Sequence, residues 1–477
     1  MAVEQGKTLV MKFGGTSVGS VEAIGQVREI VTAARQDWPR LVVVASAFSG
    51  ITNELLNSAR SAARGEMGPF EETVSALRER HAGAVEALVR DPAQNTRVRR
   101  EIEELIASFS NLAQAIGALG EATPRALDTV CSLGERISVR VLAAALRAGG
   151  LPAVAVEASR LIVTDENFQS AVPDLAETEA RTRAVLGPLL AQGQIPVVTG
   201  FIGATPSGVV TTLGRGGSDY SAALLGAALP ADEVWIWTDV DGVMTADPRI
   251  VPEARTLPEL SYREVSELAY YGAKVLHPKS IRPVIEAGIT LRVRNTFNPE
   301  HPGTLLTGGN GKANGTTIKA VTAFRGMKLV TVEGRGMLGV PGVAARIFSA
   351  VATTGATVPL ITEASSEQSL TFAVPCEAAG EVLAVLEREL AEEIRRRNID
   401  RVWATEEVVI VTTVCPGMRH RLGVAGRIFS ALGDAGVNVL AIAHGSSDVS
   451  ISLVVTVADT QRTIRALHRL TEPVGAG

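Results

Sequence analysis

Short runs of almost uninterrupted apolar residues recur through the N-terminal part of the chain, between segments in which apolar residues return every three or four positions. Uninterrupted runs rich in valine and isoleucine predict strands covered on both faces in a parallel sheet, and the three-to-four spacing predicts helices. Their alternation indicates a layered α/β/α domain. The predicted strands are 8–13, 41–48, 151–156, 195–202 and 234–240, and the predicted helices include 21–35, 127–147 and 219–229.

Residues 58–120 show a helical pattern laced with charges and no strand pattern. A charge-rich helical surface of this kind is typical of a solvated face. We therefore expect a helical excursion on one side of the sheet, without a binding patch of its own.

The C-terminal part of the chain repeats itself. GVAARIFSA at 342–350 returns as GVAGRIFSA at 423–431, and LITEASSEQS at 360–369 returns as AIAHGSSDVS at 441–450. Both blocks are displaced by 81 residues (423 − 342 and 441 − 360), which indicates two copies of one unit. Each copy predicts the order strand, helix, strand, strand, helix of a ferredoxin-like fold. Facing units would form a groove and a dimer interface; a repeat that only packs is the alternative.

Composition narrows the class of protein. A formal net charge of −5 and a pI near 5.9 disfavour nucleic acid or an anionic membrane as the main partner. The N-terminus has no signal-peptide pattern, and no uncharged apolar run is long enough to span a bilayer. Three scattered cysteines fit a reducing cytoplasm and neither disulfides nor a zinc site. We expect a cytoplasmic globular protein.

The segment KFGGTSVGS, at 12–20, follows a predicted strand and precedes a predicted helix. Its paired glycines let a ligand approach the backbone, Thr16 and Ser17 add hydroxyl groups, and the helix N-terminus supplies unpaired N–H groups. These features predict an anion site, in which the Lys12 ammonium would act as a point charge on a phosphate. The spacing is not that of the Walker P-loop or of a dinucleotide fingerprint.

A second segment, GRGGSD at 214–219, repeats this arrangement before another predicted helix. Two such loops in one α/β domain indicate that both sides of a transferring phosphoryl group are held. Arg215 is suited to grip a substrate carboxylate with two parallel hydrogen bonds, and Asp219 to hold the lysine or a metal-bound water. The alternative is that Ser218 and Asp219 only cap the helix.

Polar groups also stand where a later strand is predicted to end. The segment WTDVDGVMTADPR, at 237–249, places Thr238, Asp239 and Asp241 at the carboxyl end of a strand, where open α/β sheets bind ligands. In YGAKVLHP, Lys274 stands at a helical turn before a proline.

Glu135 is an acidic residue in an otherwise apolar predicted helix, within CSLGERIS. Judged by composition alone, an ion pair with Arg136 or Arg140 is the simplest explanation. A role in binding a ligand is the alternative.

Five motifs in chain order closely resemble those of aspartate kinase, a family with the amino-acid kinase (carbamate kinase-like) fold. They are KFGGTS, SLGE, TTLGRGGSDYS, WTDVDG with TADPR, and GAKVLHP. The C-terminal repeat resembles its tandem ACT domains. The resemblance covers essentially the whole chain, and the five motifs together are specific. It implies a three-layer α/β/α catalytic domain over 1–305, a linker and the first strand of the second ACT unit over 306–325, and ACT domains over 326–403 and 404–477.

No homoserine dehydrogenase domain follows the second ACT unit, so the resemblance implies a monofunctional enzyme. Its ACT sequences, GMLGVPGVAARIF and AIAHGSSD, are nevertheless most similar to those of bifunctional aspartokinase–homoserine dehydrogenases.

The resemblance implies transfer of the ATP γ-phosphoryl group to the side-chain carboxylate of L-aspartate. The products would be 4-phospho-L-aspartate and ADP, in the first step toward lysine, threonine and methionine. A carboxylate is already ionised at neutral pH, so catalysis requires positioning and charge neutralisation but no general base. Mg²⁺ would travel on the ATP phosphates, with no metal site on the protein. A homodimer or dimer of dimers is expected, without nucleic-acid or membrane partners.

Matched motif by motif, the resemblance assigns roles to individual residues. Lys12 would stabilise the transferring phosphoryl group, and Asp219 would organise that centre. Arg215 would bind the α-carboxylate of aspartate and Glu135 its ammonium, which outweighs the ion-pair explanation of Glu135. The other implied substrate-binding residues are Thr52 and Ser218, and the implied ATP-binding residues are Lys12, Gly14, Gly15, Thr238, Asp239, Arg249 and Lys274.

Some positions depart from the family pattern. The family often has tyrosine where this chain has Met244, which alters a contact on the adenine side. Threonine-sensitive relatives carry glutamine at the positions of Glu363 and His444, and a lysine-sensitive relative carries aspartate at the position of Pro359. The effector, lysine or threonine, therefore cannot be copied across, and weak feedback or a dedicated pathway copy, such as one for ectoine, stays open. The predicted allosteric residues are Met337, Gly342, Glu363 and His444.

Two other functions are alternatives to this one. The chain could be another amino-acid kinase, such as acetylglutamate or glutamate 5-kinase, although neither is expected to combine tandem ACT repeats with SLGE and GRGGSDYS. It could also be an effector-sensing protein with an inactive kinase domain. Loss of Lys12, Arg215 or Asp219 would mark such a protein, and all three are present.

Overall fold

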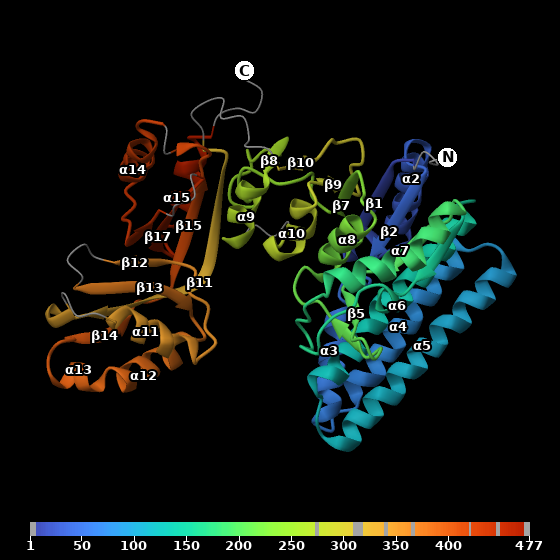
Figure 1. The fold of residues 1–477 in the computed structure, drawn as a ribbon, viewed down its shortest axis with the longest axis horizontal. Helices are drawn as coiled ribbons and strands as arrows, with labels where there is room; N and C mark the ends of the chain where they lie inside the picture. Colours follow the sequence, from blue (N-terminus) through green and yellow to red (C-terminus); the bar gives the residue numbers. More distant parts are fainter. Residues whose placement is uncertain are drawn as a thin grey trace. The chain divides into compact units, whose positions relative to one another are not determined.

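The computed structural model describes residues 6–271, 276–308, 318–337, 342–363, 368–418, 421–444 and 449–471. They form two compact units that interleave along the sequence (Figure 1). The first unit comprises Met1–Val243, Pro258–Tyr262 and Val275–Gly309, and the second comprises Met244–Leu257, Arg263–Lys274 and Asn310–Gly477.

The first unit is built on a sheet that has eight strands among the described residues. They are β1 (Thr8–Phe13), β2 (Arg40–Ala45), β3 (Ala153–Val156), β4 (Ile195–Thr199), β7 (Glu233–Thr238), β8 (Glu259–Ser261), β9 (Thr290–Asn295) and β10 (Thr304–Thr307). Their order is β3-β4-β2-β1-β7-β9-β10-β8, and neighbours run parallel except for the antiparallel pair β9 and β10. Every residue of β1 is buried, which explains its uninterrupted apolar run.

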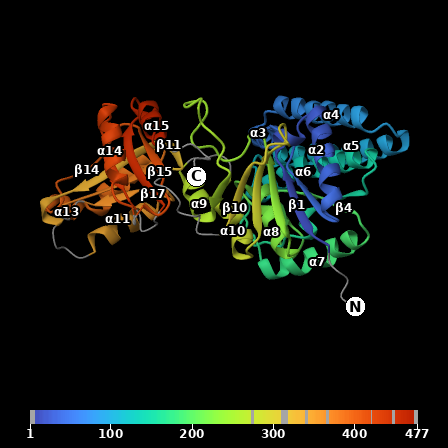
Figure 2. The ribbon, with the colours of Figure 1, turned by 90° about the horizontal axis from the view of Figure 1, so that it is seen from above.

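Helices cover both faces of this sheet, as Figure 2 shows. One face carries α2 (Val21–Asp37) and α6 (Pro124–Ala148), and the other carries α7 (Leu175–Ala191), α8 (Gly217–Ala228) and α10 (Pro278–Glu286). The predicted helical excursion forms α3 (Ile51–Ala63), α4 (Gly68–Leu88) and α5 (Pro92–Leu119), which pack against α6. The predicted three-layer α/β/α fold is confirmed. Smaller elements of this unit are α1 (Gly15–Val18), η1 (Ala158–Arg160) and the antiparallel pair β5 (Ile202–Ala204) and β6 (Val210–Thr212).

Side-chain caps fix where several of these helices begin. Ser20, Asp91, Thr123 and Asp174 precede α2, α5, α6 and α7, and each accepts a hydrogen bond from the backbone N–H three residues later. Such caps satisfy N–H groups that have no partner inside the helix. α8 differs, because its N-cap is Gly216 and makes no side-chain hydrogen bond.

The second unit holds an antiparallel sheet with helices. Its strand order is β12-β13-β11-β15-β17-β16, and β14 also pairs with β11. The elements are α9 (Tyr262–Tyr270, whose first residue belongs to the first unit), β11 (Ala320–Glu333), η2 (Arg335–Met337), α11 (Val343–Ala352), β12 (Ile361–Glu363), β13 (Ser369–Pro375), α12 (Ala379–Glu389), α13 (Ala391–Arg395), β14 (Arg401–Ala404), β15 (Val408–Val414), α14 (Val424–Asp434), β16 (Ala441–Ala443), β17 (Ser450–Thr456) and α15 (Thr460–His468).

The sequence repeat is also a structural repeat. α11 and α14 begin 81 residues apart, and so do β13 and β17 (424 − 343 and 450 − 369). β11 belongs to both copies, because its register shifts between Phe324 and Met327. Residues 320–324 pair with β15 and residues 327–333 pair with β13, and Met327 also pairs with Val408 of β15. The two predicted ferredoxin-like units are confirmed, while their exact boundaries stay a prediction.

Two further expectations concern the whole chain. Cys131, Cys376 and Cys415 are all free thiols. Within the described ranges, no helix has both the length and the apolar character that crossing a bilayer requires.

Candidate active site

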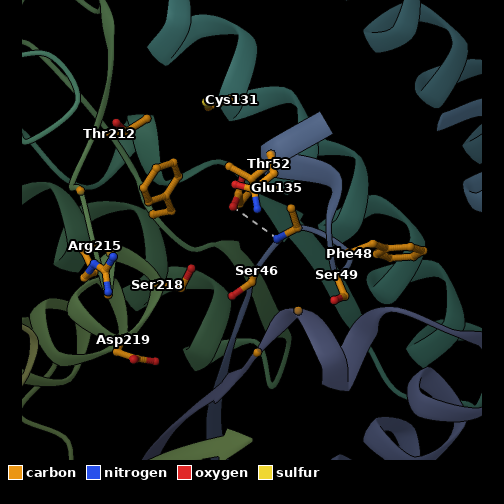
Figure 3. A pocket seen from close by; sticks show the side chains of 18 of the residues that line it. Ser46, Phe48, Ser49, Thr52, Cys131, Glu135, Thr212, Arg215, Ser218 and Asp219 are labelled. Atoms are coloured by element: carbon orange, nitrogen blue, oxygen red, sulfur yellow. Dashed lines mark hydrogen bonds between the residues drawn. The ribbon is translucent and has the colours of Figure 1, made fainter. Parts of the chain in front are cut away.

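A cavity of about 700 Å³ lies in the first unit, where β1, β2 and β7 end and α8 begins (Figure 3). Carboxyl ends of parallel strands are where sheets of this type bind ligands. All of the residues predicted for catalysis or substrate binding line this cavity, together with part of the predicted ATP site. They are Lys12, Gly14, Gly15, Thr52, Glu135, Arg215, Ser218, Asp219 and Thr238.

An ion pair joins the two glycine-containing segments. Lys12 is near the end of β1, Asp219 is in the first turn of α8, and the Lys12 Nζ lies 2.7 Å from the Asp219 Oδ1. The two side chains are only 11% and 14% exposed, so their attraction is screened less than on the surface. The structure thus brings together the two residues predicted to be catalytic.

Both glycine segments approach neighbouring groups so closely that a side chain would be crowded. A Cβ added at Gly15 would lie 3.0 Å from the Ala47 carbonyl oxygen, and one added at Gly217 would lie 2.6 Å from the Phe201 ring. Glycine at these positions therefore lets the loops that surround the cavity pack together.

The first glycine segment differs in detail from the prediction. Gly14 is the N-cap of the one-turn helix α1, so the glycines do not lead directly into α2. Thr16 lines the cavity as expected. Ser17 is fully buried, and its Oγ lies 2.7 Å from the Thr296 Oγ1, so its hydroxyl is engaged away from the cavity.

The alternative that Ser218 and Asp219 only cap α8 is wrong. The N-cap is Gly216, in a left-handed conformation (φ +71°) and without a side-chain hydrogen bond. Ser218 and Asp219 lie inside the first turn, where Asp219 pairs with Lys12. The N-terminus of α8 therefore presents side chains and backbone N–H groups to the cavity.

Glu135 is a buried carboxyl at the inner end of the cavity. Its Oε1 accepts a hydrogen bond from the Ala47 N–H at 3.3 Å, while its Oε2 has no hydrogen-bond partner among the residues that the structure describes. Burial raises the pKa of Glu135 to about 8. Burial and the nearby Glu135 charge also raise the pKa of Cys131 to about 12, which disfavours its thiolate. An orphan buried oxygen is costly, and a cationic ligand would satisfy it.

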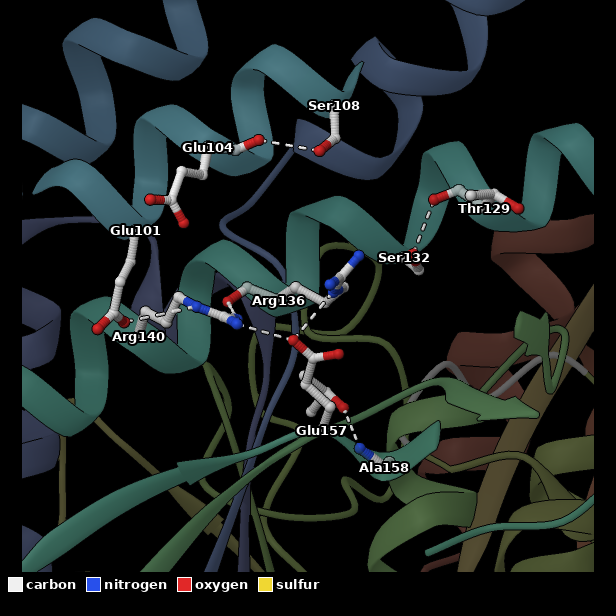
Figure 4. Close-up of polar contacts among 10 residues, drawn as sticks. Glu101, Glu104, Ser108, Thr129, Ser132, Arg136, Arg140, Glu157 and Ala158 are labelled. Carbon is white, nitrogen blue, oxygen red and sulfur yellow. Dashed lines mark hydrogen bonds and ion pairs between the residues drawn. The ribbon is translucent and has the colours of Figure 1, made fainter. Parts of the chain in front are cut away.

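The simplest explanation of Glu135, an ion pair with Arg136 or Arg140, is wrong. Both arginines pair with Glu157, at 3.1 Å from the Arg136 Nε and 2.8 Å from an Arg140 terminal nitrogen (Figure 4). Burial alone would raise the pKa of Glu157, but the hydrogen bond from Arg140 and the charge of Arg136 outweigh it and lower that pKa. The arginines anchor the segment after β3, which leaves Glu135 to the cavity.

Arg215, Thr52 and Ser218 add polar groups around the cavity. Arg215 is exposed and has no ion-pair partner in the part of the chain that the structure describes. Figure 3 shows Arg215 and Ser218 on one side and Thr52 beside Glu135 on another. The cavity therefore offers a free guanidinium, a buried carboxyl and hydroxyl groups to one ligand.

The predicted ATP-binding residues are spread more widely. Thr238 lines the cavity at the end of β7, and its Oγ1 donates to Asp239 Oδ1 at 3.2 Å. Arg249 belongs to the second unit, is 78% exposed and pairs with Asp247 at 2.7 Å. Lys274 lies outside the described residues.

The predicted allosteric residues lie in the second unit, at related places in the two repeats. Glu363 ends β12, and His444 follows β16 at the corresponding position 81 residues later (444 − 363). These two strands are close together. Gly342 is the N-cap of α11 with a φ of +87°, and Met337 is buried.

Several cavity residues were missed: Thr212 stands in TTLGRGGSDYS but was given no role, and no motif contains the others. A signal existed for one group: buried polar residues at 128, 135 and 138 recur on one face of α6. Asp128 and Glu135 line the cavity, and the Ser138 hydroxyl donates to the Ser46 carbonyl at 2.7 Å. The others come from loops that carry no periodicity. The missed cavity residues include Ser46, Phe48, Arg60, Asp128, Gln169, Phe201 and Thr212.

The sequence matches two family profiles. That of the amino acid kinase family covers residues 7–295, and that of an ACT domain covers residues 330–390 and again 411–470. The two ACT matches begin 81 residues apart (411 − 330), which is the displacement of the repeat.

Similar proteins cover nearly all of the chain. The bifunctional aspartokinase/homoserine dehydrogenase of Haemophilus influenzae is 35% identical over 463 residues, or 96% of this chain and 56% of that protein. The chain spans about half the length of the bifunctional relatives that it matches. Aspartokinase 1, chloroplastic, of Arabidopsis thaliana is 33% identical over 479 residues, or 98% of this chain and 80% of that protein.

A solved structure is similar to this chain over nearly its whole length. E. coli aspartokinase III in complex with aspartate and ADP (R-state) gives a TM-score of 0.82 at 32% identity, over 97% of this chain and 99% of that one. The same enzyme in complex with lysine and aspartate (T-state) gives 0.77, over 98% and 100%.

The three-layer fold, with two glycine segments and an ion-paired lysine at one sheet edge, defines an amino acid kinase, and the chain belongs to this family. Within it, the chain is homologous to the aspartokinases. The resemblance found in the motifs is confirmed.

Proposed function

We propose that the protein is an aspartate kinase, which transfers the γ-phosphoryl group of ATP to the side-chain carboxylate of L-aspartate. One observation carries this proposal: the Lys12–Asp219 pair, the free guanidinium of Arg215 and the buried carboxyl of Glu135 converge on one cavity. The names of the relatives and the aspartate and ADP bound to the E. coli enzyme support it.

The acceptor amino acid matches the charges of the cavity. Arg215 would bind the α-carboxylate of aspartate with two parallel hydrogen bonds, and the Glu135 Oε2 would accept one from its ammonium. Thr52 and Ser218 would add hydroxyl donors to its carboxylates. An N-acetylated acid would leave this buried carboxyl without a cationic partner, which disfavours such a substrate.

The reaction is a direct transfer. A side-chain carboxylate oxygen of aspartate forms a bond to the γ-phosphorus as the bond from that phosphorus to the ADP oxygen breaks, and 4-phospho-L-aspartate and ADP result. The Lys12 ammonium would neutralise charge on the transferring phosphoryl group, while Asp219 holds the Lys12 side chain in place. The Gly14 N–H already donates to the Trp237 carbonyl at 3.2 Å, so the N–H groups at the start of α1, from Gly15 onward, would bind phosphate oxygens.

ATP would extend from Lys12, Gly14 and Gly15 toward Thr238 and Asp239. We propose that Mg²⁺ arrives on the ATP phosphates, since it keeps several waters and needs few protein carboxylates. The donors around the cavity suit phosphate oxygens, and Asp219 adds one carboxylate nearby. The full set of proposed ATP-binding residues also includes Arg249 and Lys274.

Regulation through the ACT repeat is part of the proposal. The catalytic domain would span 1–305, the linker and shared strand 306–325, and the ACT domains 326–403 and 404–477. An amino acid would bind near Met337, Gly342, Glu363 and His444. The Glu363 carboxylate favours a cationic effector such as lysine, which the E. coli relative binds in its T-state structure, and threonine is the alternative. We also propose a cytoplasmic homodimer or dimer of dimers that serves lysine, threonine and methionine synthesis.

A hydroxamate assay that offers ATP with L-aspartate, N-acetyl-L-glutamate or L-glutamate, each alone, tests the choice of acceptor. We expect hydroxamate from aspartate at a rate far above that from the other two. The highest turnover on either of the others would identify a different amino-acid kinase. No product from any of them, in a protein that binds an amino acid, would identify a sensor with an inactive kinase domain.

A further inference from the structure

The carboxylate of Asp128 connects two loops beside the cavity. Asp128 lies on α6 and is 1% exposed. Its Oδ2 accepts hydrogen bonds from the N–H groups of Gln169 and Thr212, both at 2.9 Å, and its Oδ1 accepts one from the Thr212 Oγ1 at 2.8 Å. Oδ1 is also 3.1 Å from the Gln169 nitrogen. Donors from two separate loops therefore meet on one buried carboxylate.

One of these loops is held in an unfavourable conformation. Gln169 has a φ of +70°, in the left-handed region that residues other than glycine rarely adopt. Such strain persists only where the surroundings enforce it, and it is common at ligand sites. The hydrogen bond to Asp128 is one contact that enforces it here.

The other loop carries Arg215. It leaves β6 at Thr212 and passes through Gly214 before α8 begins. The two loops pack backbone to backbone: the Ala171 N–H donates to the Thr212 carbonyl at 2.9 Å, and a Cβ added at Gly214 would lie 3.1 Å from the Gln169 carbonyl oxygen. The position of Arg215 thus depends on where this pair of loops is held.

We propose that Asp128 is a positioning residue, which holds the loops of Gln169 and Thr212 so that Arg215 meets the α-carboxylate of aspartate. This inference rests on the proposed function. Asp128 does not itself take part in the phosphoryl transfer, because both of its oxygens are engaged by loop donors. Removing the carboxylate would leave several buried donors without an acceptor, and the loops would move to satisfy them.

The effect of Asp128 should fall on aspartate and not on ATP. Its hydrogen bonds reach the loops on the Arg215 side. Gly14 and Thr238, proposed for ATP, lie at the ends of β1 and β7 and make no hydrogen bond to Asp128. A residue needed only for general stability would disturb both substrates alike. The ratio of the two KM changes therefore separates positioning from a structural role.

The test compares Asp128→Asn, Asp128→Ala and Thr212→Val with wild type. Asparagine offers one acceptor oxygen where the carboxylate has two, and valine removes the hydroxyl donor without changing the shape. In each variant we expect the fold-increase in the KM for aspartate to be at least about five times the fold-increase in the KM for ATP. The kcat should change less than about threefold. Thr212→Ser keeps the hydroxyl donor, so its KM for aspartate should equal that of wild type.

Asp232→Asn is the matched control. Asp232 also accepts a backbone hydrogen bond, from the Thr8 N–H at 2.7 Å, but at the amino end of β1. It should leave both KM values unchanged. For each variant, the fold-increase in the KM for aspartate is divided by the fold-increase in the KM for ATP. If this ratio is below about five in both Asp128→Asn and Thr212→Val, the positioning role is wrong. Asp128→Ala is read by the same criterion if it folds.

Hydrogen–deuterium exchange of the free protein gives a readout that does not depend on the reaction. Asp128→Asn should speed exchange in peptides covering 165–172 and 210–217, and Asp232→Asn should not. Unchanged exchange in those peptides would overturn the inference even in an active enzyme. If the wild type makes no aspartyl phosphate, the proposed function has failed, and the assignment of Arg215 to aspartate falls with it.

Discussion

At the scale of single residues, the Lys12 ammonium is fixed before any substrate arrives. Its backbone is part of a fully buried strand, and its Nζ is held by Asp219 in the first turn of α8. A charge that is already oriented needs no reorganisation as the transition state forms, which is the main source of catalytic power in phosphoryl transfer.

Lys12→Ala should therefore lower kcat by at least about 10²-fold, because the transferring phosphoryl group loses its neutralising charge. Circular dichroism should show an unchanged fold. Lys7→Ala, an exposed lysine just before β1, is the control and should keep wild-type turnover. Turnover of Lys12→Ala within a few-fold of wild type would contradict the role.

Glu135 makes aspartate binding depend on pH. Burial raises its pKa to about 8 in the free protein, so below that pH the carboxyl is mostly neutral and binds an ammonium poorly. The KM for aspartate should therefore fall as the pH rises from about 6.5 to about 8.5, while the ligand ammonium stays charged. Steady-state kinetics across this range measures it. In Glu135→Gln the dependence should vanish and the KM should be high throughout; a flat wild-type profile would contradict the assignment.

The same pKa shift predicts how stability changes with pH. A carboxyl whose pKa is raised by folding favours the folded state fully below its ordinary pKa of 4.5, and this stability is lost as the pH rises to about 8. The loss is at most about 1.4 kcal/mol per pH unit. The glutamine in Glu135→Gln cannot ionise. The melting temperature of this variant minus that of wild type should therefore be larger at pH about 8.5 than at pH about 5. A constant difference would show that Glu135 is already ionised in the free protein.

Individual site residues could be predicted where a motif concentrated them. Lys12 and Arg215 stand beside glycines in loops that end strands, so sequence and chemistry pointed the same way. Asp128 and Phe48 could not be found like this, because they reach the cavity only through tertiary packing. Ser17 was expected at the anion site, but its hydroxyl bonds to Thr296, far away in the sequence.

At the scale of elements, the start of α8 decides the geometry of the site. Gly216 caps this helix with a positive φ, and its carbonyl accepts a hydrogen bond from the Ser280 hydroxyl at 3.0 Å. A Cβ at Gly216 would lie 2.6 Å from the Ser280 Oγ. The conformation and the crowding together require glycine at this point.

Gly216→Ala should lower the melting temperature and reduce activity strongly, because relieving the clash moves the first turn of α8 and with it Asp219. Gly150→Ala is the matched control: Gly150 also has a positive φ (+85°), but nothing lies near its added Cβ. It should cost only the backbone strain, roughly 1–2 kcal/mol, and keep kcat. Equal losses of activity in the two variants would contradict a special role for the α8 cap.

The elements that were predicted correctly are those whose pattern is long and uniform. Every residue of β1 is buried, so its apolar run and its structure coincide. The one-turn helix α1 was not predicted, because its four residues are too few to show a periodicity. Its first residue, Gly15, lies so close to the Ala47 carbonyl that an added Cβ would be 3.0 Å from it.

At the scale of the whole molecule, the two ACT copies share a strand. β11 pairs with β15 before its register shift and with β13 after it. A change in one copy can therefore be passed to the other through a single strand. Coupling of this kind requires an effector that binds two states with different affinity.

Titration with lysine, threonine and methionine, singly and in pairs, should reveal an effector that shifts activity or melting temperature. We expect lysine to do so, because Glu363 offers a carboxylate to its side-chain ammonium. Glu363→Gln should weaken this response without changing the KM for aspartate in the absence of effector. Glu381→Gln, on the exposed face of α12, is the control. No shift with any of the three amino acids would remove the sensing role.

The organisation of the whole chain was partly predictable. The repeat was evident because two blocks share one displacement, and the same displacement recurs in α11 and α14. The interleaving of the two compact units was not, since no change in composition marks Met244–Leu257 or Arg263–Lys274 as part of the second unit. Membership of these segments depends on tertiary contacts alone.

Phosphorus NMR of the product formed from ATP and aspartate labelled with ¹⁸O in its side-chain carboxylate tests the central claim most directly. If that carboxylate attacks the γ-phosphorus, the acyl phosphate signal must show the isotope shift of one bridging ¹⁸O. An acyl phosphate without this shift, or only unlabelled inorganic phosphate, would contradict the account.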